Sequence, residues 1–223
     1  MRVVIAGGHG QIARRLGRLL TERGDVAVGL IRNPSQADDL RELGIEPVHL
    51  DLERATAADI ELALEDADAA VFAAGAGPGS GVARKDTVDR AAAVLLADAA
   101  RQAGVRRYLL VSSMGVEGVR DGATPPGTDE VFAAYLRATL AAEDAVRATD
   151  LEWTILRPGR LTDDPGTGRV RLAPHVERGD IPRDDVAAVL AALLDEPATA
   201  GLVLELTSGD TPIAEAVSQV AQR

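Results

Sequence analysis

The sequence predicts a single α/β domain, built on a doubly wound parallel sheet with a small C-terminal substrate lobe. Apolar runs of strand length alternate with longer segments of helical periodicity over the first 157 residues. Such alternation gives a parallel sheet with helices on both faces. The length of 223 residues suits one domain. A glycine-rich turn between the first strand and the first helix is typical of the Rossmann form of this architecture.

Each predicted element follows from a local pattern. The first strand is a short β-branched run that ends at Gly7, and the first helix carries Ile12, Leu16 and Leu20 on one face. The second and fourth helices stop at Gly44 and Gly104. The predicted strands are 3–6, 25–31, 45–50, 68–74, 107–111 and 152–156. The predicted helices between them are 11–23, 36–43, 57–64, 84–103 and 130–148.

The chain is expected to divide into a dinucleotide-binding core, residues 1–157, and a C-terminal lobe, residues 158–223. A loop rich in glycine and proline opens the lobe, which we expect to cover the ligand cleft. Its predicted elements are a strand near 169–172, a helix near 183–194, a strand at 202–206 and a helix from residue 213.

Composition excludes several classes of partner. The net charge of −11 is opposite to that of most nucleic-acid and anionic-membrane binders. The chain has no cysteine, and its three histidines are scattered, so no metal site is expected. No apolar run is long enough to cross a membrane, and the expected compartment is the cytoplasm. Monomer and homodimer both stay open.

The strongest motif is the segment Gly7-Gly8-His9-Gly10-Gln11-Ile12-Ala13. Its glycines permit a tight turn, and they let backbone N–H groups approach a pyrophosphate. The helix that follows presents unpaired donors and the positive end of its dipole. A strand before the turn and a helix after it make the motif more specific than glycines alone. The sequence therefore predicts a dinucleotide site here.

Charge at the end of the second strand favours NADP(H) over NAD(H). An NAD site usually has an acidic residue at this position, whereas this strand ends at Ile31-Arg32. Arg32 is expected to pair with a 2′-phosphate, with Arg14 and Arg15 adding charge. Asp51-Leu52, after the third strand, is expected to border the adenine, although Asp51 is nearly as well explained as a turn carboxylate.

Further motifs carry a family resemblance. With this loop and Asp51-Leu52, the chain resembles the atypical short-chain dehydrogenase/reductase superfamily, in the NAD(P)H-binding branch near NmrA-like and flavin-reductase-like members. The other segments that carry the resemblance are Ala73-Ala74-Gly75, Val111-Ser112-Ser113, Tyr135 with Ala138, and Thr154-Ile155-Leu156-Arg157-Pro158-Gly159.

The resemblance implies which residues touch the cofactor. The pyrophosphate contacts would come from the glycine loop, and Arg32 would lie at the adenosine end. The loop contacts are Gly7, His9, Gly10, Gln11 and Ile12. The implied ribose contacts are Ala74, Gly75 and Ala76. The implied nicotinamide contacts are Ser112, Ser113, Pro158, Gly159 and Leu161.

The family's catalytic pair is incomplete in this chain. Reductases of the superfamily use Tyr-x-x-x-Lys, in which the lysine lowers the tyrosine pKa and binds the ribose. The match here is Tyr135, with Thr139 in the lysine position. Threonine carries no charge and cannot assist a phenol by Coulomb attraction, although it could still bind the ribose. Tyr135 and Ser113 are the candidate catalytic residues, Ser113 as a polar contact to substrate.

Three functions are compatible with these residues. The first is an NADP(H)-dependent oxidoreductase acting on a quinone, flavin or carbonyl compound. The second is a non-catalytic NADP(H) sensor of the NmrA type, which Thr139 favours. The third is a sugar-nucleotide epimerase or dehydratase, for which a lobe of roughly 60 residues is small.

Overall fold

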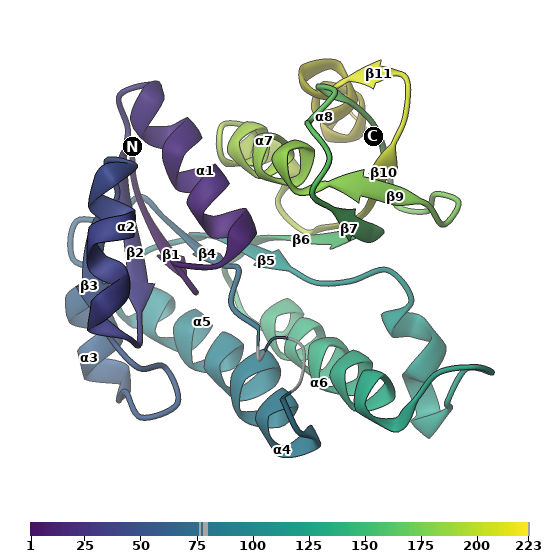
Figure 1. Ribbon diagram of the computed structural model, residues 1–223, viewed down its shortest axis with the longest axis horizontal. Helices are drawn as coiled ribbons and strands as arrows, with labels where there is room; N and C mark the ends of the chain where they lie inside the picture. Colours follow the sequence, from purple (N-terminus) through teal and green to yellow (C-terminus); the bar gives the residue numbers. More distant parts are fainter. Residues whose placement is uncertain (76, 78–79, 223) are drawn as a thin grey trace.

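A computed structural model describes residues 1–75, 77 and 80–222. Figure 1 shows helices on both faces of a central sheet, which confirms the predicted α/β architecture. Within the described residues the sheet has the order β11-β8-β10-β6-β5-β4-β1-β2-β3. Its strands are β1 (Arg2–Ala6), β2 (Val26–Ile31), β3 (Glu46–His49), β4 (Ala69–Phe72), β5 (Arg107–Val111), β6 (Glu152–Pro158), β8 (Arg169–Ala173), β10 (Leu202–Ser208) and β11 (Thr211–Pro212).

Most of the sheet is parallel. Strands β3, β2, β1, β4, β5, β6 and β10 pair in one direction, and β8 runs antiparallel to β10 and β11. From β1 the chain adds strands outward to one side of the sheet, and from β4 it adds them outward to the other side. The order therefore reverses between β1 and β4, and the carboxyl ends of these two strands flank a crevice, where ligands bind in such sheets. The C-terminal third therefore extends the same sheet through β8, β10 and β11.

Helices cover both faces because each strand alternates its side chains. Val3 and Ile5 of β1 pack into one apolar cluster, whereas Val4 and Ala6 pack into another on the opposite face. The first cluster lies under α1 (Gln11–Glu22), α2 (Ala37–Glu42), α7 (Arg183–Leu194) and α8 (Ile213–Ala221). The second lies under α3 (Ala57–Ala63), α5 (Ala93–Gln102) and α6 (Glu130–Arg147).

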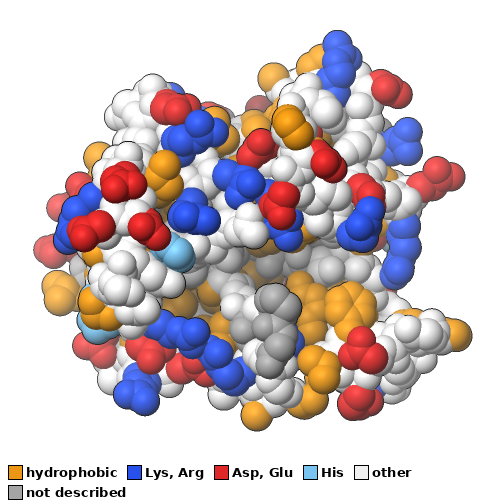
Figure 2. All heavy atoms as spheres, in the orientation of Figure 1, with side chains coloured by type: hydrophobic (Ala, Val, Ile, Leu, Met, Phe, Trp, Pro, Cys, Tyr) orange, Lys and Arg blue, Asp and Glu red, His pale blue; other side chains and the backbone are white. Residues whose placement is uncertain are grey.

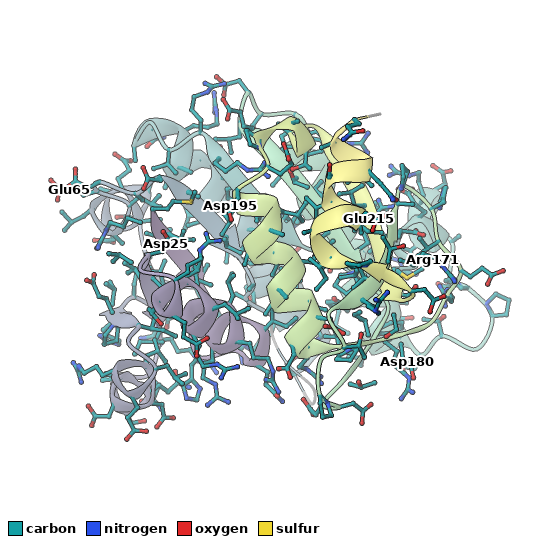
Figure 3. The ribbon with its side chains drawn as sticks, turned by 90° about the horizontal axis from the view of Figure 1, so that it is seen from above. Asp25, Glu65, Arg171, Asp180, Asp195 and Glu215 are labelled. Atoms are coloured by element: carbon teal, nitrogen blue, oxygen red, sulfur yellow. The ribbon has the colours of Figure 1, made fainter. Side chains whose placement is uncertain are left out.

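Of the C-terminal helices, α7 packs directly on the N-terminal helix α1, and α8 packs on α7. Figure 3 looks onto this face, where α1, α7 and α8 lie next to one another. Arg23, after the end of α1, donates to Asp195 at the end of α7 over 2.5 Å. Residues far apart in sequence thus share one core.

Two features near the carboxyl ends of the strands were not predicted. In place of one regular helix over 84–103, the chain forms α4 (Val82–Arg84), a π-helical segment (Lys85–Ala92) and then α5. A short parallel pair, β7 (Arg160–Thr162) and β9 (Asp180–Pro182), lies beyond the end of β6. Among the described residues, no helix combines the length and the apolar character that crossing a bilayer requires.

Candidate functional site

The turn between β1 and α1 accepts only glycine at two positions. Gly7 has a φ of +76°, and an added β-carbon there would lie 2.5 Å from the Cα of Ala74. A β-carbon on Gly8 would lie 2.5 Å from the Cα of Gly29 in β2. The turn is closed by the Gly10 N–H, which donates to the Gly7 carbonyl over 2.7 Å. The glycines therefore let the turn fit between β2 and β4 as well as approach a ligand.

The N-terminus of α1 fits an anionic group. Gly10 is its N-cap and offers no side-chain cap, and the first turn contains no acidic residue. The first N–H groups of a helix have no partner within it, and they lie at the positive end of its dipole. A pyrophosphate held here would meet free donors and no opposing charge.

A cavity of about 290 Å³ extends from this turn toward the ends of β2 and β3. Arg32 at its edge has 57% of its side chain exposed and lies 3.5 Å from Glu53. Glu53 also accepts hydrogen bonds from Arg84 at 2.7 Å and from Thr87 at 2.8 Å. These contacts, the one from Arg84 above all, hold the pKa of Glu53 below its usual range. The lining residues are Gly7, His9, Gly10, Leu30, Arg32, Gln36, Leu50, Asp51, Leu52, Glu53, Ala73, Ala74, Gly75, Arg84 and Val88.

The other charged candidates near this cavity are held by local contacts. Asp51 accepts the N–H of Glu53 over 3.1 Å, as a turn carboxylate does, and it also lines the cavity. His9 lies 2.7 Å from Asp39. The prediction that Arg15 adds charge at the adenosine end is wrong. Arg15 donates to Asp184 of α7 over 2.6 Å, because α7 packs against α1.

A larger cavity of about 1000 Å³ opens beyond the carboxyl ends of β4, β5 and β6. It shares Ala73, Ala74 and Gly75 with the smaller one, so the two are contiguous. Figure 2 looks onto the hollow, with hydrophobic side chains gathered on its lower side. Predicted site residues that line it are Ala74, Gly75, Ser112, Ser113, Tyr135, Thr139, Pro158, Gly159 and Leu161. Ala76, predicted with them, lies outside the described residues.

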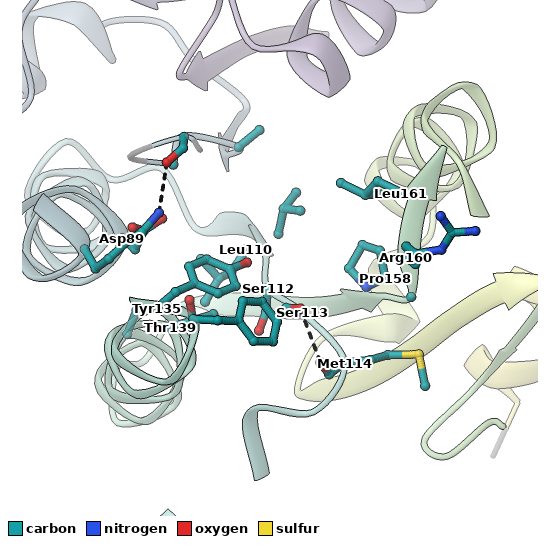
Figure 4. A pocket seen from close by; sticks show the side chains of 18 of the residues that line it. Asp89, Leu110, Ser112, Ser113, Met114, Tyr135, Thr139, Pro158, Arg160 and Leu161 are labelled. Carbon is teal, nitrogen blue, oxygen red and sulfur yellow. Dashed lines mark hydrogen bonds between the residues drawn. The ribbon is translucent and has the colours of Figure 1, made fainter. Parts of the chain in front are cut away.

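Figure 4 shows Tyr135 and Thr139 on one side of this cavity and Pro158 and Leu161 on the other. Burial raises the pKa of the Tyr135 phenol above its usual range, and the charge of Asp89 adds to this. The hydroxyls of Ser113 and Thr139 act in the opposite direction. The phenol is therefore protonated at neutral pH and is able to donate a proton rather than accept one.

Thr139 is buried beneath the tyrosine, with 5% of its surface exposed. Within the described chain its Oγ1 lacks a partner at hydrogen-bonding geometry. A buried hydroxyl without a partner costs free energy, which a ligand hydroxyl would recover. On the opposite wall of the cavity Gly159 leaves no room for a side chain, because a β-carbon there would collide with the carbonyl oxygen of Gly179.

A lysine that the motif analysis missed lies beside Tyr135. Lys85 of the π-helical segment is 8% exposed, and its Nζ lies 5.4 Å from the centroid of the Tyr135 ring. The same Nζ donates to the Gly77 carbonyl over 3.0 Å. The amino-acid composition could have drawn attention to Lys85, because it is the only lysine in a chain with 24 lysine and arginine residues.

Ser112 faces a buried network below the cavity floor. Its hydroxyl donates to Glu143 of α6, which also accepts from Arg157 of β6 over 2.9 and 2.5 Å. Arg157 donates to Glu117 as well, over 2.6 Å. Ser113, the next residue, donates only weakly to the Met114 carbonyl, over 3.3 Å. Of the two serines, Ser113 is thus the freer to contact a ligand.

A family comparison identifies this arrangement. The NAD(P)H-binding family matches residues 7–197, which include the glycine turn and the walls of both cavities. The chain belongs to this NAD(P)H-binding family. Membership confirms the resemblance predicted from the motifs, and it establishes a nicotinamide cofactor without distinguishing NADP(H) from NAD(H).

Named relatives resemble the chain over nearly all of its length. The uncharacterized sugar epimerase YhfK of Bacillus subtilis is 36% identical over 99% of this chain and 100% of its own. A Bacillus halodurans protein, provisionally named an NAD-dependent epimerase/dehydratase, is 35% identical with a TM-score of 0.89, covering 99% and 100% of the two chains. ChuY, an anaerobilin reductase of Escherichia coli O157:H7, is 26% identical with a TM-score of 0.77, covering 94% and 98%.

Proposed function

We propose that this protein is an NADP(H)-dependent oxidoreductase that reduces a planar, conjugated small molecule such as a quinone or a flavin. The observation that carries the proposal is the pair of contiguous cavities, which run from Arg32 past the glycine turn to Tyr135. One end suits the adenosine of a dinucleotide, and the other leaves room for a substrate. The bound cofactor would supply the hydride.

The preference for NADP(H) rests on how Arg32 is held. Its ion pair with Glu53 is long and lies largely in solvent, so it is weak. Glu53 is satisfied by Arg84 and Thr87, and it keeps its contacts when Arg32 turns away. A 2′-phosphate would then gain a bidentate guanidinium contact.

The preference for a planar substrate rests on the distribution of aromatic residues. The chain has five, and three of them, Phe72, Phe132 and Tyr135, line the larger cavity. Phe132 is 47% exposed at the mouth and stacks on Tyr135, with ring centroids 5.7 Å apart. The exposed Phe132 ring at the mouth offers an apolar face to a flat ligand.

The residues around the substrate would bind it and handle one proton. The apolar wall of Pro158 and Leu161 would exclude water from the reacting face. The Tyr135 phenol would give its proton to the oxygen or nitrogen that receives negative charge as hydride arrives. Ser113 would orient that atom by a hydrogen bond.

Thr139 favours a second candidate, an NADP(H) sensor without turnover, because it leaves the helix of Tyr135 without a lysine. Two relatives carry epimerase in their names, and the same missing lysine makes a sugar-nucleotide epimerase our third choice. Turnover separates these functions from the oxidoreductase.

The first experiment titrates the protein with NADPH and NADH in parallel, following thermal stabilisation and nicotinamide fluorescence. We expect NADPH to bind at least tenfold more tightly. A panel of quinones, flavins and simple carbonyl compounds then follows NADPH oxidation at 340 nm. Binding without oxidation of NADPH by any acceptor would favour the sensor, and failure of both cofactors to bind would refute all three functions.

A further inference from the structure

The helix of Tyr135 lacks the cation that a proton-donating tyrosine ordinarily has beside it. Thr139 occupies that position and carries no charge. A phenol that gives up a proton leaves negative charge on its oxygen and ring, and in a buried site this charge is costly without a positive partner. The chain therefore needs a cation from elsewhere if Tyr135 is to act as an acid.

Lys85 lies where such a cation is needed. It belongs to the π-helical segment, which packs against α6, and its ammonium group lies over the face of the Tyr135 ring. The segment directs Lys85, Val88 and Asp89 inward, and π-helical turns of this kind occur frequently at functional sites.

We propose that Lys85 is the positioning residue for Tyr135, supplying from the π-helical segment the positive charge that Thr139 does not supply. The part that Lys85 plays in catalysis rests on the proposed oxidoreductase function. In that reaction the O–H bond of Tyr135 breaks, the proton bonds to the acceptor atom, and the electron pair stays on the phenol oxygen. The ammonium group of Lys85 stabilises this charge, because phenolate attracts a cation over its ring more strongly than phenol does.

The residue type and its contacts suit this role. Elsewhere the chain uses arginine for positive charge, and its single lysine is buried at this cavity. Among the described residues Lys85 forms no ion pair, and its one hydrogen bond goes to the Gly77 carbonyl. An ammonium group has three donors, so Lys85 keeps donor capacity toward a ligand.

Other charges facing Tyr135 act against Lys85. The negative charges of Asp89, in the π-helical segment, and of Glu143, in α6, both oppose ionisation of the phenol. The loop after β5 contributes only the neutral hydroxyl of Ser113. Lys85 lies over the ring, so its removal should leave the phenol harder to ionise.

The test is a spectrophotometric titration of tyrosinate at 295 nm. The chain has two tyrosines, and Tyr108 is fully buried with its hydroxyl donating to the Ala93 carbonyl over 2.9 Å. Burial raises the pKa of Tyr108 far above its usual range. Tyr135 lines the open cavity and is therefore the tyrosine expected to titrate first. Lys85→Met should raise the Tyr135 midpoint by about 1–2 pH units, as expected for one charge at this distance in a medium of intermediate dielectric constant.

Two variants make the result specific. Lys85→Arg keeps a charge that does not titrate, and it should hold the midpoint close to the wild-type value. Arg90→Met removes a charge from the outer side of the same segment, where Arg90 pairs with Asp86, and should shift the midpoint by less than about 0.3 units. No upward shift in Lys85→Met, or an equal shift in Arg90→Met, would overturn the proposal.

A second measurement needs no neutral variant at Lys85. With one lysine in the chain, ¹³C NMR of its Cε gives a single resonance, which should show a second inflection as Tyr135 ionises. Tyr135→Phe should abolish that inflection, and its absence from the wild-type protein would refute the coupling. Neither titration requires turnover, so the coupling and the oxidoreductase function can fail separately.

Discussion

The buried network below the cavity offers a test of what holds α6 to the sheet. Glu143 has no exposed surface, and Arg157 retains 5%. Arg157 gives Glu143 two hydrogen bonds, and Ser112 gives it a third. Glu143→Gln keeps the size of the side chain while removing its charge, so it isolates the electrostatic contribution.

The expected cost follows from burial. Removing one member of a buried ion pair costs about 3–5 kcal/mol, because the remaining charge loses its compensation. Glu117 remains within 2.6 Å of Arg157 and compensates part of the loss. We therefore expect about 3 kcal/mol, which for a chain of this length lowers Tm by about 6–12 °C.

Urea unfolding at pH 7, followed by circular dichroism, measures this loss. The matched control is Asp150→Asn, which breaks the exposed pair with Arg101, where 70% of the aspartate side chain is accessible. That control should cost less than about 1 kcal/mol. If Glu143→Gln lost no more than Asp150→Asn, the assignment of the network as a stabilising element would be refuted.

The remaining predictions concern the cofactor end and the acid range. Arg32→Asp should weaken NADPH binding by about 10- to 100-fold, the value of a lost charge-assisted contact, and NADH binding by less than about threefold. The control in parallel titrations is Arg54→Asp, at a residue that lies next to the cavity without lining it. If Arg32→Asp weakened NADPH and NADH binding equally, Arg32 would have no role in cofactor specificity. Gly8→Ala places a β-carbon against the backbone of β2. It should lower the free energy of unfolding in urea by about 1–3 kcal/mol and should also abolish cofactor binding. A variant that is fully stable and still binds the cofactor would contradict the packing argument. The hydrogen bond from Arg120 holds the pKa of Glu117 at about 2, below its ordinary value of 4.5. Its ionised form therefore contributes stability above about pH 4.5, which is lost as the pH falls toward 2. Glu117→Gln should flatten the acid dependence of urea unfolding between pH 5 and 2, and an unchanged slope would count against this contribution.

Local patterns in the sequence were sufficient for the sheet and its crossovers. The run Val3–Ala6 became β1, because alternate side chains fill the two opposite clusters. Helical periodicity gave α1 and α6 within one or two residues of their observed ends. The segment over 84–103 was expected as one regular helix. Its π-helical part forms where Lys85 and Asp89 turn inward against α6, which periodicity along one segment does not reveal.

The sequence alone determined the class of fold, the glycine turn and the cation at the end of β2, because each depends on residues that are neighbours along the chain. Tertiary structure decided which distant groups meet. Lys85 lies over the ring of Tyr135, Arg157 and Ser112 converge on Glu143, and Arg15 pairs with Asp184. These contacts arise from the packing of whole helices and strands, in which apolar burial sets the position of each element. Polar side chains carried along with those elements are thereby brought together, although the sequence separates them by as many as 169 positions.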